Sequence, residues 1–234
     1  MLRSSLFKRR QLLYLGGTGI VGIFGGAVAT KTLDAHASPS VQSSNVLSAK
    51  DDKQPYLNPT GFDQQFLAKA ADIKQIWDFT TIEQIEPSGL NPIRNALNTF
   101  QFTYQKTLYP VICLRGNAVI YGIDDTMWIK YRLDTVFGQN NKSSINNNPF
   151  YSQQTTDASQ DSSLQGLQQR GAHLVLCHDA LLGLAGTLEE QRGIAADAIY
   201  NELTTHLVPG AQQTPSGSSL IAVAQHFGFT YAKQ

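Results

Sequence analysis

The sequence has little cysteine, little charge and no excess of basic over acidic residues. Its 234 residues include two cysteines, and charged residues make up 15% of the chain, with 18 basic and 18 acidic side chains. This balance argues against a disordered chain and lacks the basic excess of a nucleic-acid-binding domain. The chain has no series of long apolar runs, which excludes a protein that crosses the membrane several times.

Motifs for cofactors and metals are also missing. The sequence has no Cys-x-x-Cys, no haem-attachment motif and no Gly-x-Gly-x-x-Gly after a predicted strand. His173 and Cys177 lie four residues apart on a predicted strand, which separates them by roughly 13 Å at about 3.3 Å per residue. They therefore do not share one metal ion, and the sequence predicts neither a metal nor a cofactor.

The balanced charge hides an uneven distribution along the chain. Residues 1–37 carry a net charge of +4, and the remaining residues carry a net charge of −4. Lys8-Arg9-Arg10 precedes an apolar run, Leu12–Ala29, that contains six glycines, and Ala35-His36-Ala37 supplies a small-x-small cleavage site. This order is typical of an export signal. The two arginines and the weak apolar run favour the twin-arginine route, with a mature start at Ser38.

The alternative for the first segment is an uncleaved membrane anchor, since about 18 apolar residues just span a bilayer. The six glycines favour the cleaved signal. Either interpretation predicts a periplasmic domain, with the twin-arginine translocase as a partner during export.

The remaining chain divides into a tether and one domain. Residues 38–60 are rich in Ser, Asn, Lys, Asp and Pro and are predicted to be a flexible tether. Residues 61–234 form the predicted domain, which contains a polar insertion at about 139–169. A segment this long and polar is usually a lid, a binding loop or disordered. Within it, Pro149-Phe150-Tyr151 is the part most suited to dock on the domain.

Apolar runs alternate with helical patterns through the domain. The expected strands are continuous apolar or β-prone runs, namely 76–79, 109–114, 118–123, 172–177, 212–214 and 229–232. Helical patterns are expected over 62–73 and over 91–104, the second with Asn91 as N-cap. Asp124 or Asp125 is expected to cap a further helix, a capping box over 187–190 to start a longer one, and the last helix to follow Pro215. This alternation predicts an α/β fold with a parallel sheet flanked by helices.

Chemistry in such a sheet is expected beyond the carboxyl ends of the strands. Two cysteines are predicted there, Cys113 before Arg115-Gly116 and Cys177 before His178-Asp179. Cys177 is the better candidate, because a strand passes there into a helix N-terminus whose amide dipoles favour a thiolate. His178 would add positive charge beside the thiol or shuttle a proton. The alternatives are a buried structural cysteine and a disulfide between the two cysteines.

The C-terminal part of the sequence resembles the DsrE/DsrF-like family. The resemblance covers roughly residues 73–234 and is carried by a strand that ends in cysteine, a Pro-Gly-Ala stretch, a Pro-Ser-Gly stretch and a closing Gln-to-Tyr strand, which are His173–Cys177, Leu207–Ala211, Thr214–Gly217 and Gln225–Tyr231. It implies a flavodoxin-like parallel sheet and a homo-oligomer, often a trimer or hexamer. The twin-arginine signal and the polar insertion depart from the family pattern.

In sulfur-relay members of this family, the matching cysteine accepts sulfane sulfur as a persulfide, and Cys177 inherits that role. The resemblance therefore implies an unidentified sulfur donor and acceptor as partners. The residues predicted to bind the substrate are Arg115, Gly116, Asn117 and Asp179. The alternative is a non-catalytic binding or assembly module on the same fold, so the sequence leaves open whether the protein is an enzyme.

Overall fold

The computed structural model describes residues 62–85, 89–137 and 147–233. The predicted signal at 1–37 and the tether at 38–60 lie outside these residues, as does the beginning of the polar insertion. Within the described part, no helix is long and apolar enough to cross a membrane.

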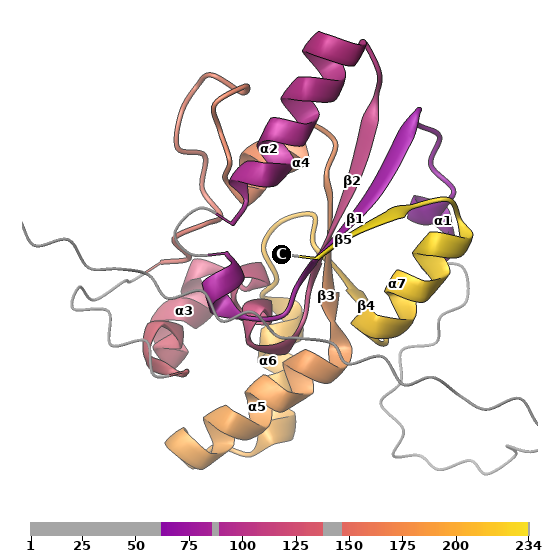
Figure 1. The fold of residues 1–234 in the computed structure, drawn as a ribbon. Helices are drawn as coiled ribbons and strands as arrows, with labels where there is room; N and C mark the ends of the chain where they lie inside the picture. The colour runs from indigo at the N-terminus through magenta and orange to yellow at the C-terminus, as the bar shows by residue number, and fades with distance from the viewer. Residues whose placement is uncertain (1–61, 86–88, 138–146, 234) are drawn as a thin grey trace, which may run out of the picture. The chain divides into compact units, whose positions relative to one another are not determined.

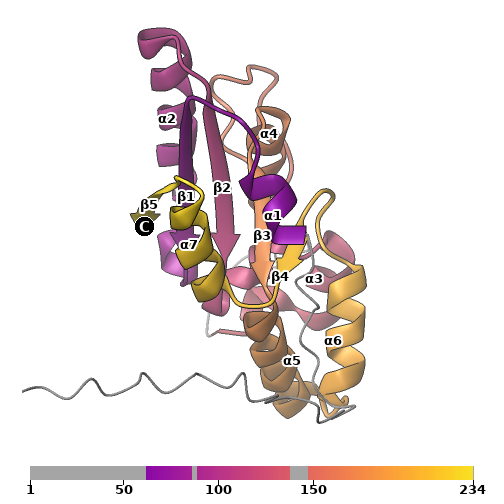
Figure 2. The ribbon, with the colours of Figure 1, turned by 90° about the vertical axis from the view of Figure 1, so that its right-hand side faces the viewer.

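Five parallel strands form one sheet in the order β4-β3-β2-β1-β5. Their bounds are Ile73–Phe79 for β1, Leu108–Leu114 for β2, His173–Cys177 for β3, Gln212–Thr214 for β4 and Thr230–Lys233 for β5. Because parallel strands need helical crossovers, helices cover both faces of the sheet (Figures 1 and 2). The predicted class, an α/β flavodoxin-like parallel sheet, is confirmed.

Alternating side chains along each strand divide the apolar core into two layers. In β2, Ile112 and Leu114 face the larger layer, whereas Val111 and Cys113 face the smaller one. The larger layer packs under helices α2 to α6, which are Asn91–Asn98, Asp125–Tyr131, Leu164–Gln169, His178–Arg192 and Ala196–Thr205. The smaller layer packs under α1, Phe62–Leu67, and α7, Gly217–His226.

The connections show where the chain changes face. The helices that follow β1, β2 and β3 all pack on the larger layer, whereas α7, which follows β4, packs on the smaller layer. The chain therefore leaves the adjacent ends of β3 and β4 toward opposite faces of the sheet. In open parallel sheets, ligands bind at such a switch point, outside the carboxyl ends of the strands.

One predicted strand is wrong. The apolar run 118–123 lies mostly in a buried 3-10 helix, Gly116–Gly122, and does not join the sheet. The preceding strand β2 already pairs with β1 and β3, so no edge remains for a further strand beside it. Gly116, at φ +53°, turns the chain out of β2 and starts the 3-10 helix.

Three helix boundaries also differ from expectation. The predicted capping box at 187–190 lies inside α5, where the Thr187 hydroxyl donates to the Gly183 carbonyl, and Gly193 in the left-handed region ends that helix. The helix expected over 91–104 continues after Asn98 as a π-helical segment, Thr99–Tyr104. Ile73, expected at the end of the first helix, is the first residue of β1.

The described part of the polar insertion packs on the domain. The buried Asn148 side chain donates to the carbonyls of Tyr121 and Ile123 at 2.6 and 3.0 Å. The Phe150 ring lies edge-on to Tyr121 with 4.9 Å between centroids, so the docking expected for residues 149–151 is observed.

Candidate functional site

Cys177 is the last residue of β3 and lies at the switch point of the sheet. Its side chain is 6% exposed, and its strand neighbour on β4 is Thr214. The backbone N–H of Gly217, the first residue of α7, donates a hydrogen bond to the Cys177 sulfur at 3.2 Å. The Cys177 sulfur therefore lies at a helix N-terminus, where the backbone amides carry partial positive charge.

The donor at the thiol comes from a different helix than the sequence indicated. The helix that directly follows Cys177 was expected to supply the amides, yet the hydrogen bond comes from Gly217 of α7. The Thr214–Gly217 stretch carried the only signal for this, since its Pro-Ser-Gly pattern marks the start of a helix.

Cys113 lies on the same face of the sheet, one strand away. A Cβ on Gly217 would lie 3.2 Å from the Cys113 sulfur and 3.0 Å from Cδ of Arg115, so both side chains pack against the start of α7. Gly217 is therefore a point of close approach where a larger residue would displace its neighbours. Both cysteines are reduced, and neither is in a disulfide.

The strand register explains why the two thiols are not bonded. Cys113 pairs with Val175, and Cys177 lies two residues further along β3. Such diagonal neighbours have Cα atoms about 7–8 Å apart, whereas a disulfide requires about 4.4–6.8 Å. A bridge would need movement of one strand along the other.

A buried ion pair adjoins the thiols. The Arg115 guanidinium donates from Nε and Nη2 to the two carboxylate oxygens of Asp78, at 2.7 and 2.8 Å, and the Asp78 side chain is fully buried. The Tyr231 hydroxyl donates to Oδ2 of the same carboxylate at 2.8 Å. The hydrogen bond to Asp78 raises the pKa of Arg115, and burial with the Asp78 contact raises the pKa of Tyr231.

Asp78 and Tyr231 were missed as site residues by the sequence reasoning. A charged residue inside the apolar run of a predicted strand is the signal that marks Asp78. Tyr231 stands in the closing stretch of the family resemblance. The register places Lys233 of β5 opposite Asp78 and Tyr231 opposite Ile76, so three strands meet at this carboxyl edge.

Two of the predicted substrate-binding residues have structural contacts. A Cβ on Gly116 would lie 2.3 Å from the Thr80 carbonyl oxygen, so the turn after β2 requires glycine. The Asn117 side chain accepts a hydrogen bond from the Ile82 N–H at 2.9 Å and anchors the loop after β1. Arg115 remains the polar group of this segment that is both near the thiols and, at 31% exposure of its side chain, open to solvent.

His178 and Asp179 lie in the first turn of α5. The His178 ring is fully buried, and its Nδ1 lies 2.5 Å from the Tyr200 hydroxyl of α6. Burial lowers the pKa of His178. His178 thus contacts α6, which packs on the larger layer, whereas the Cys177 sulfur contacts α7 on the smaller layer. Asp179 is exposed to solvent.

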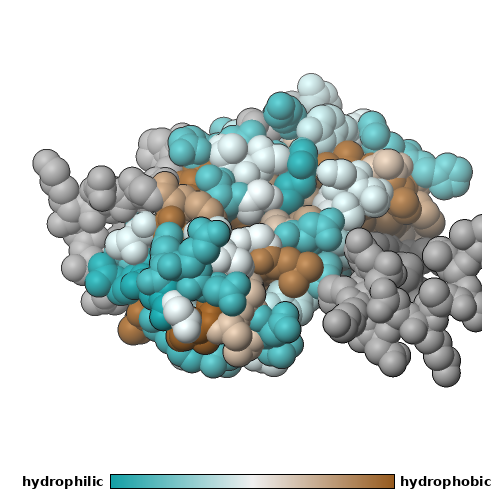
Figure 3. Space-filling view, turned by 90° about the horizontal axis from the view of Figure 1, so that it is seen from below, coloured by the Kyte–Doolittle hydropathy of each residue, from teal (hydrophilic) through white to brown (hydrophobic). Residues whose placement is uncertain are grey.

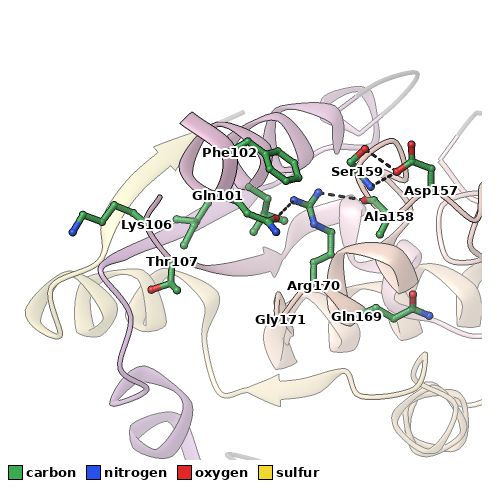
Figure 4. A pocket seen from close by; sticks show the side chains of 12 residues that line it. Gln101, Phe102, Lys106, Thr107, Asp157, Ala158, Ser159, Gln169, Arg170 and Gly171 are labelled. Carbon is green, nitrogen blue, oxygen red and sulfur yellow. Dashed lines mark hydrogen bonds between the residues drawn. The ribbon is translucent and has the colours of Figure 1, made fainter. Parts of the chain in front are cut away.

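A hollow without either thiol lies at the other end of the sheet. A groove of about 830 Å³ lies beside the amino ends of β2 and β3, between the π-helical segment and residues 157–159. Arg170 extends across it toward Gln101 and the Ala158 carbonyl, and the exposed Phe102 ring borders it (Figure 4). The groove contains neither thiol, so its size alone does not make it the reactive site.

Other chemical features of the described residues are few. They contain no group of three or more His, Cys, Asp and Glu side chains that would hold a metal ion. On the face of the molecule seen in Figure 3, hydrophobic side chains are interspersed with hydrophilic ones.

The comparisons with known proteins add no family assignment. Neither the family models nor the curated proteins contain a match to this chain.

Proposed function

We propose that this chain is an exported DsrE/DsrF-like protein that binds or transfers sulfane sulfur through a persulfide on Cys177. The observation that carries the proposal is the hydrogen bond from the first amide of α7 to the Cys177 sulfur, at the switch point of a parallel sheet. A donor fixed by a helix stabilises a sulfur anion, whether it is the thiolate or the outer sulfur of a persulfide.

The proposed chemistry is a displacement at sulfur. The Cys177 thiol first loses its proton to solvent, and the thiolate attacks a terminal sulfur of an inorganic polysulfide dianion. A new bond forms between Sγ and that sulfur, and the adjacent S–S bond breaks with its electron pair on the shortened polysulfide. The product is a Cys177 persulfide anion, which passes its outer sulfur to an acceptor thiolate in the same way.

Site-resolved mass spectrometry after incubation with polysulfide tests this function directly. We expect a +32 Da adduct on Cys177 of the folded, reduced protein, absent from Cys177→Ser. Cys113→Ser is the matched control, because Cys113 is fully buried and its loss should leave the adduct on Cys177. Absence of the adduct from the folded wild-type protein contradicts the proposal.

The burial of Cys177 favours a second candidate, a binding or assembly module without sulfur chemistry. At 6% exposure the thiol resembles an ordinary core cysteine. Iodoacetamide separates the two functions. Labelling of Cys177 in the folded protein supports the reactive site, whereas labelling that begins only on unfolding makes Cys177 structural.

A further inference from the structure

Arg115 packs against the Gly217 position, which both thiols also approach, and its guanidinium is held in a specific way. Two of the five N–H donors of its guanidinium bind the Asp78 carboxylate in parallel. This bidentate geometry fixes the plane of the guanidinium as well as its position. The Arg115 side chain as a whole is 31% exposed to solvent.

The anchor for Arg115 comes from two further strands. Asp78 belongs to β1 and is fully buried, so its carboxylate has no freedom to follow a moving partner. Tyr231 belongs to β5 and binds the carboxylate oxygen that also accepts from Nη2 of Arg115. Strand β5 is thereby linked to the Arg115 guanidinium through the Asp78 carboxylate.

The stem of Arg115 and both cysteines pack around the same backbone position. Arg115 Cδ and the Cys113 sulfur approach the Cβ position of Gly217 at 3.0 and 3.2 Å, and the Gly217 N–H donates to Cys177. A fixed cation beside two thiols attracts an anionic reagent and orients it before it reacts.

We propose that Asp78 and Tyr231 are positioning residues that hold Arg115 beside the thiols, so that Cys177 reacts preferentially with anionic electrophiles. This preference rests on the proposed function. It implies that the sulfur donor is an anion, such as an inorganic polysulfide, and not a neutral organic polysulfide.

Two alkylating reagents of the same leaving group measure this preference without sulfur. Iodoacetate is an anion, iodoacetamide is neutral, and both transfer a two-carbon unit to the thiolate as iodide leaves. The readout is the ratio of their rate constants at Cys177, from site-resolved mass spectrometry of the folded full chain. A merely structural role changes both rates together and leaves their ratio unchanged.

Arg115→Gln should lower the iodoacetate-to-iodoacetamide ratio by about two- to fivefold, the range expected for one partly exposed charge. Asp78→Asn should lower it too, although this variant makes the site more positive. If net charge alone set the preference, Asp78→Asn would raise the ratio, and that result overturns the positioning role. Arg132→Gln is the matched control, because Arg132 also pairs with an aspartate, Asp134, from two N–H donors.

Tyr231→Phe keeps the proposal falsifiable if Asp78→Asn does not fold. It removes one hydroxyl from a residue that is 40% exposed, and we expect a smaller decrease in the same ratio. An unchanged ratio in Arg115→Gln, or in Tyr231→Phe, overturns the proposal. The polysulfide adduct is scored separately, so an Arg115-dependent ratio without an adduct refutes the sulfur function alone, and an adduct with an Arg115-independent ratio refutes the anion preference alone.

Discussion

On the face of the sheet covered by α2 to α6, apolar side chains reach the carboxyl ends of the central strands, whereas on the face covered by α1 and α7 polar side chains replace them near that edge. On that face β1 carries Asp78 and β3 ends in Cys177, next to Cys113 of the smaller apolar layer, and Arg115 directly follows β2. The difference follows from the connections, because α7 is the sole crossover on its face among the described elements. A thinly covered strand end leaves room for polar groups, and the chain places its reactive side chains there.

The largest expected effect is the loss of unfolding free energy when a buried leucine is replaced by alanine, and we expect this loss to differ between the two apolar layers. Leu176 and Leu220 are both buried, at 0 and 1% exposure, but Leu176 packs in the larger layer and Leu220 on α7. Replacing leucine by alanine costs about 2–5 kcal/mol, and more where the surroundings cannot collapse. We expect Leu176→Ala near the upper end and Leu220→Ala near the lower end, measured by urea unfolding.

The comparison of the two leucine variants fails if their losses in unfolding free energy are equal or reversed. Equal slopes of unfolding free energy against urea concentration are the control, because a changed slope would show that one variant also alters the denatured state.

The turn that carries Arg115 gives the next largest effect. Gly116 and Gly193 both have positive φ, at +53° and +68°, but a Cβ on Gly116 would lie 2.3 Å from a backbone oxygen, and one on Gly193 would meet open space. Gly193→Ala should therefore cost only the left-handed conformation, about 1 kcal/mol. Gly116→Ala should cost about 2–3 kcal/mol, because strain and a steric clash combine. Thermal unfolding of the two variants measures the difference, and similar costs would contradict the clash.

One histidine on each face, the buried His178 and the half-buried His173, predicts how stability depends on pH. Burial lowers the pKa of both His178, under α5 and α6, and His173, whose ring stacks on Phe66 of α1 at 4.2 Å. Because the folded pKa is below the unfolded value of about 6.5, the unfolded chain binds more protons as the pH falls below that value. As the pH falls below about 6.5, the free energy of unfolding should therefore decrease by up to about 1.4 kcal/mol per pH unit for each histidine. The decrease should end when the pH reaches the pKa of that histidine in the folded protein.

Single variants assign this pH dependence to one face or the other. His178→Gln and His173→Gln should each reduce the slope of unfolding free energy against pH between about 6.5 and 5 by the share of one histidine. A slope that is unchanged in both variants would place the proton uptake on other groups.

The sequence indicated most strands but not the contacts that build the site. Continuous apolar runs predicted β2 and β3 to within one residue, because a strand buried on both faces leaves a strong local signal. The run 118–123 has the same composition and forms a 3-10 helix, since pairing edges are a property of the whole sheet. Composition cannot show which strand already has two neighbours.

The same limit applies to the candidate site. Cys177 and Arg115 were predicted from their places after apolar runs, and both lie at the carboxyl edge. Asp78, Gly217 and Tyr231 join them through strand order and register, over separations of 37 to 153 residues. His178 was expected beside the thiol because it is adjacent in sequence, yet it begins α5 and contacts Tyr200 of α6, whereas the Cys177 sulfur contacts α7.

The smallest predicted effect is that of replacing Asp179, which tests whether α5 as well as α7 influences the reactivity of Cys177. Asp179 is exposed in the first turn of α5, so its charge interacts favourably with that helix N-terminus by about 0.3–1 kcal/mol. Asp179→Asn should lower stability by no more than this amount. Because the amide at the Cys177 sulfur belongs to α7, the rate of iodoacetamide labelling at Cys177 should stay at the wild-type value. A labelling rate that changes by more than about twofold, beyond the effect of one exposed surface charge, would mean that the first turn of α5 also controls the thiol. Helices on both faces of the sheet would then influence the reactivity of Cys177, and the difference between the two faces would not extend to the carboxyl ends of the strands.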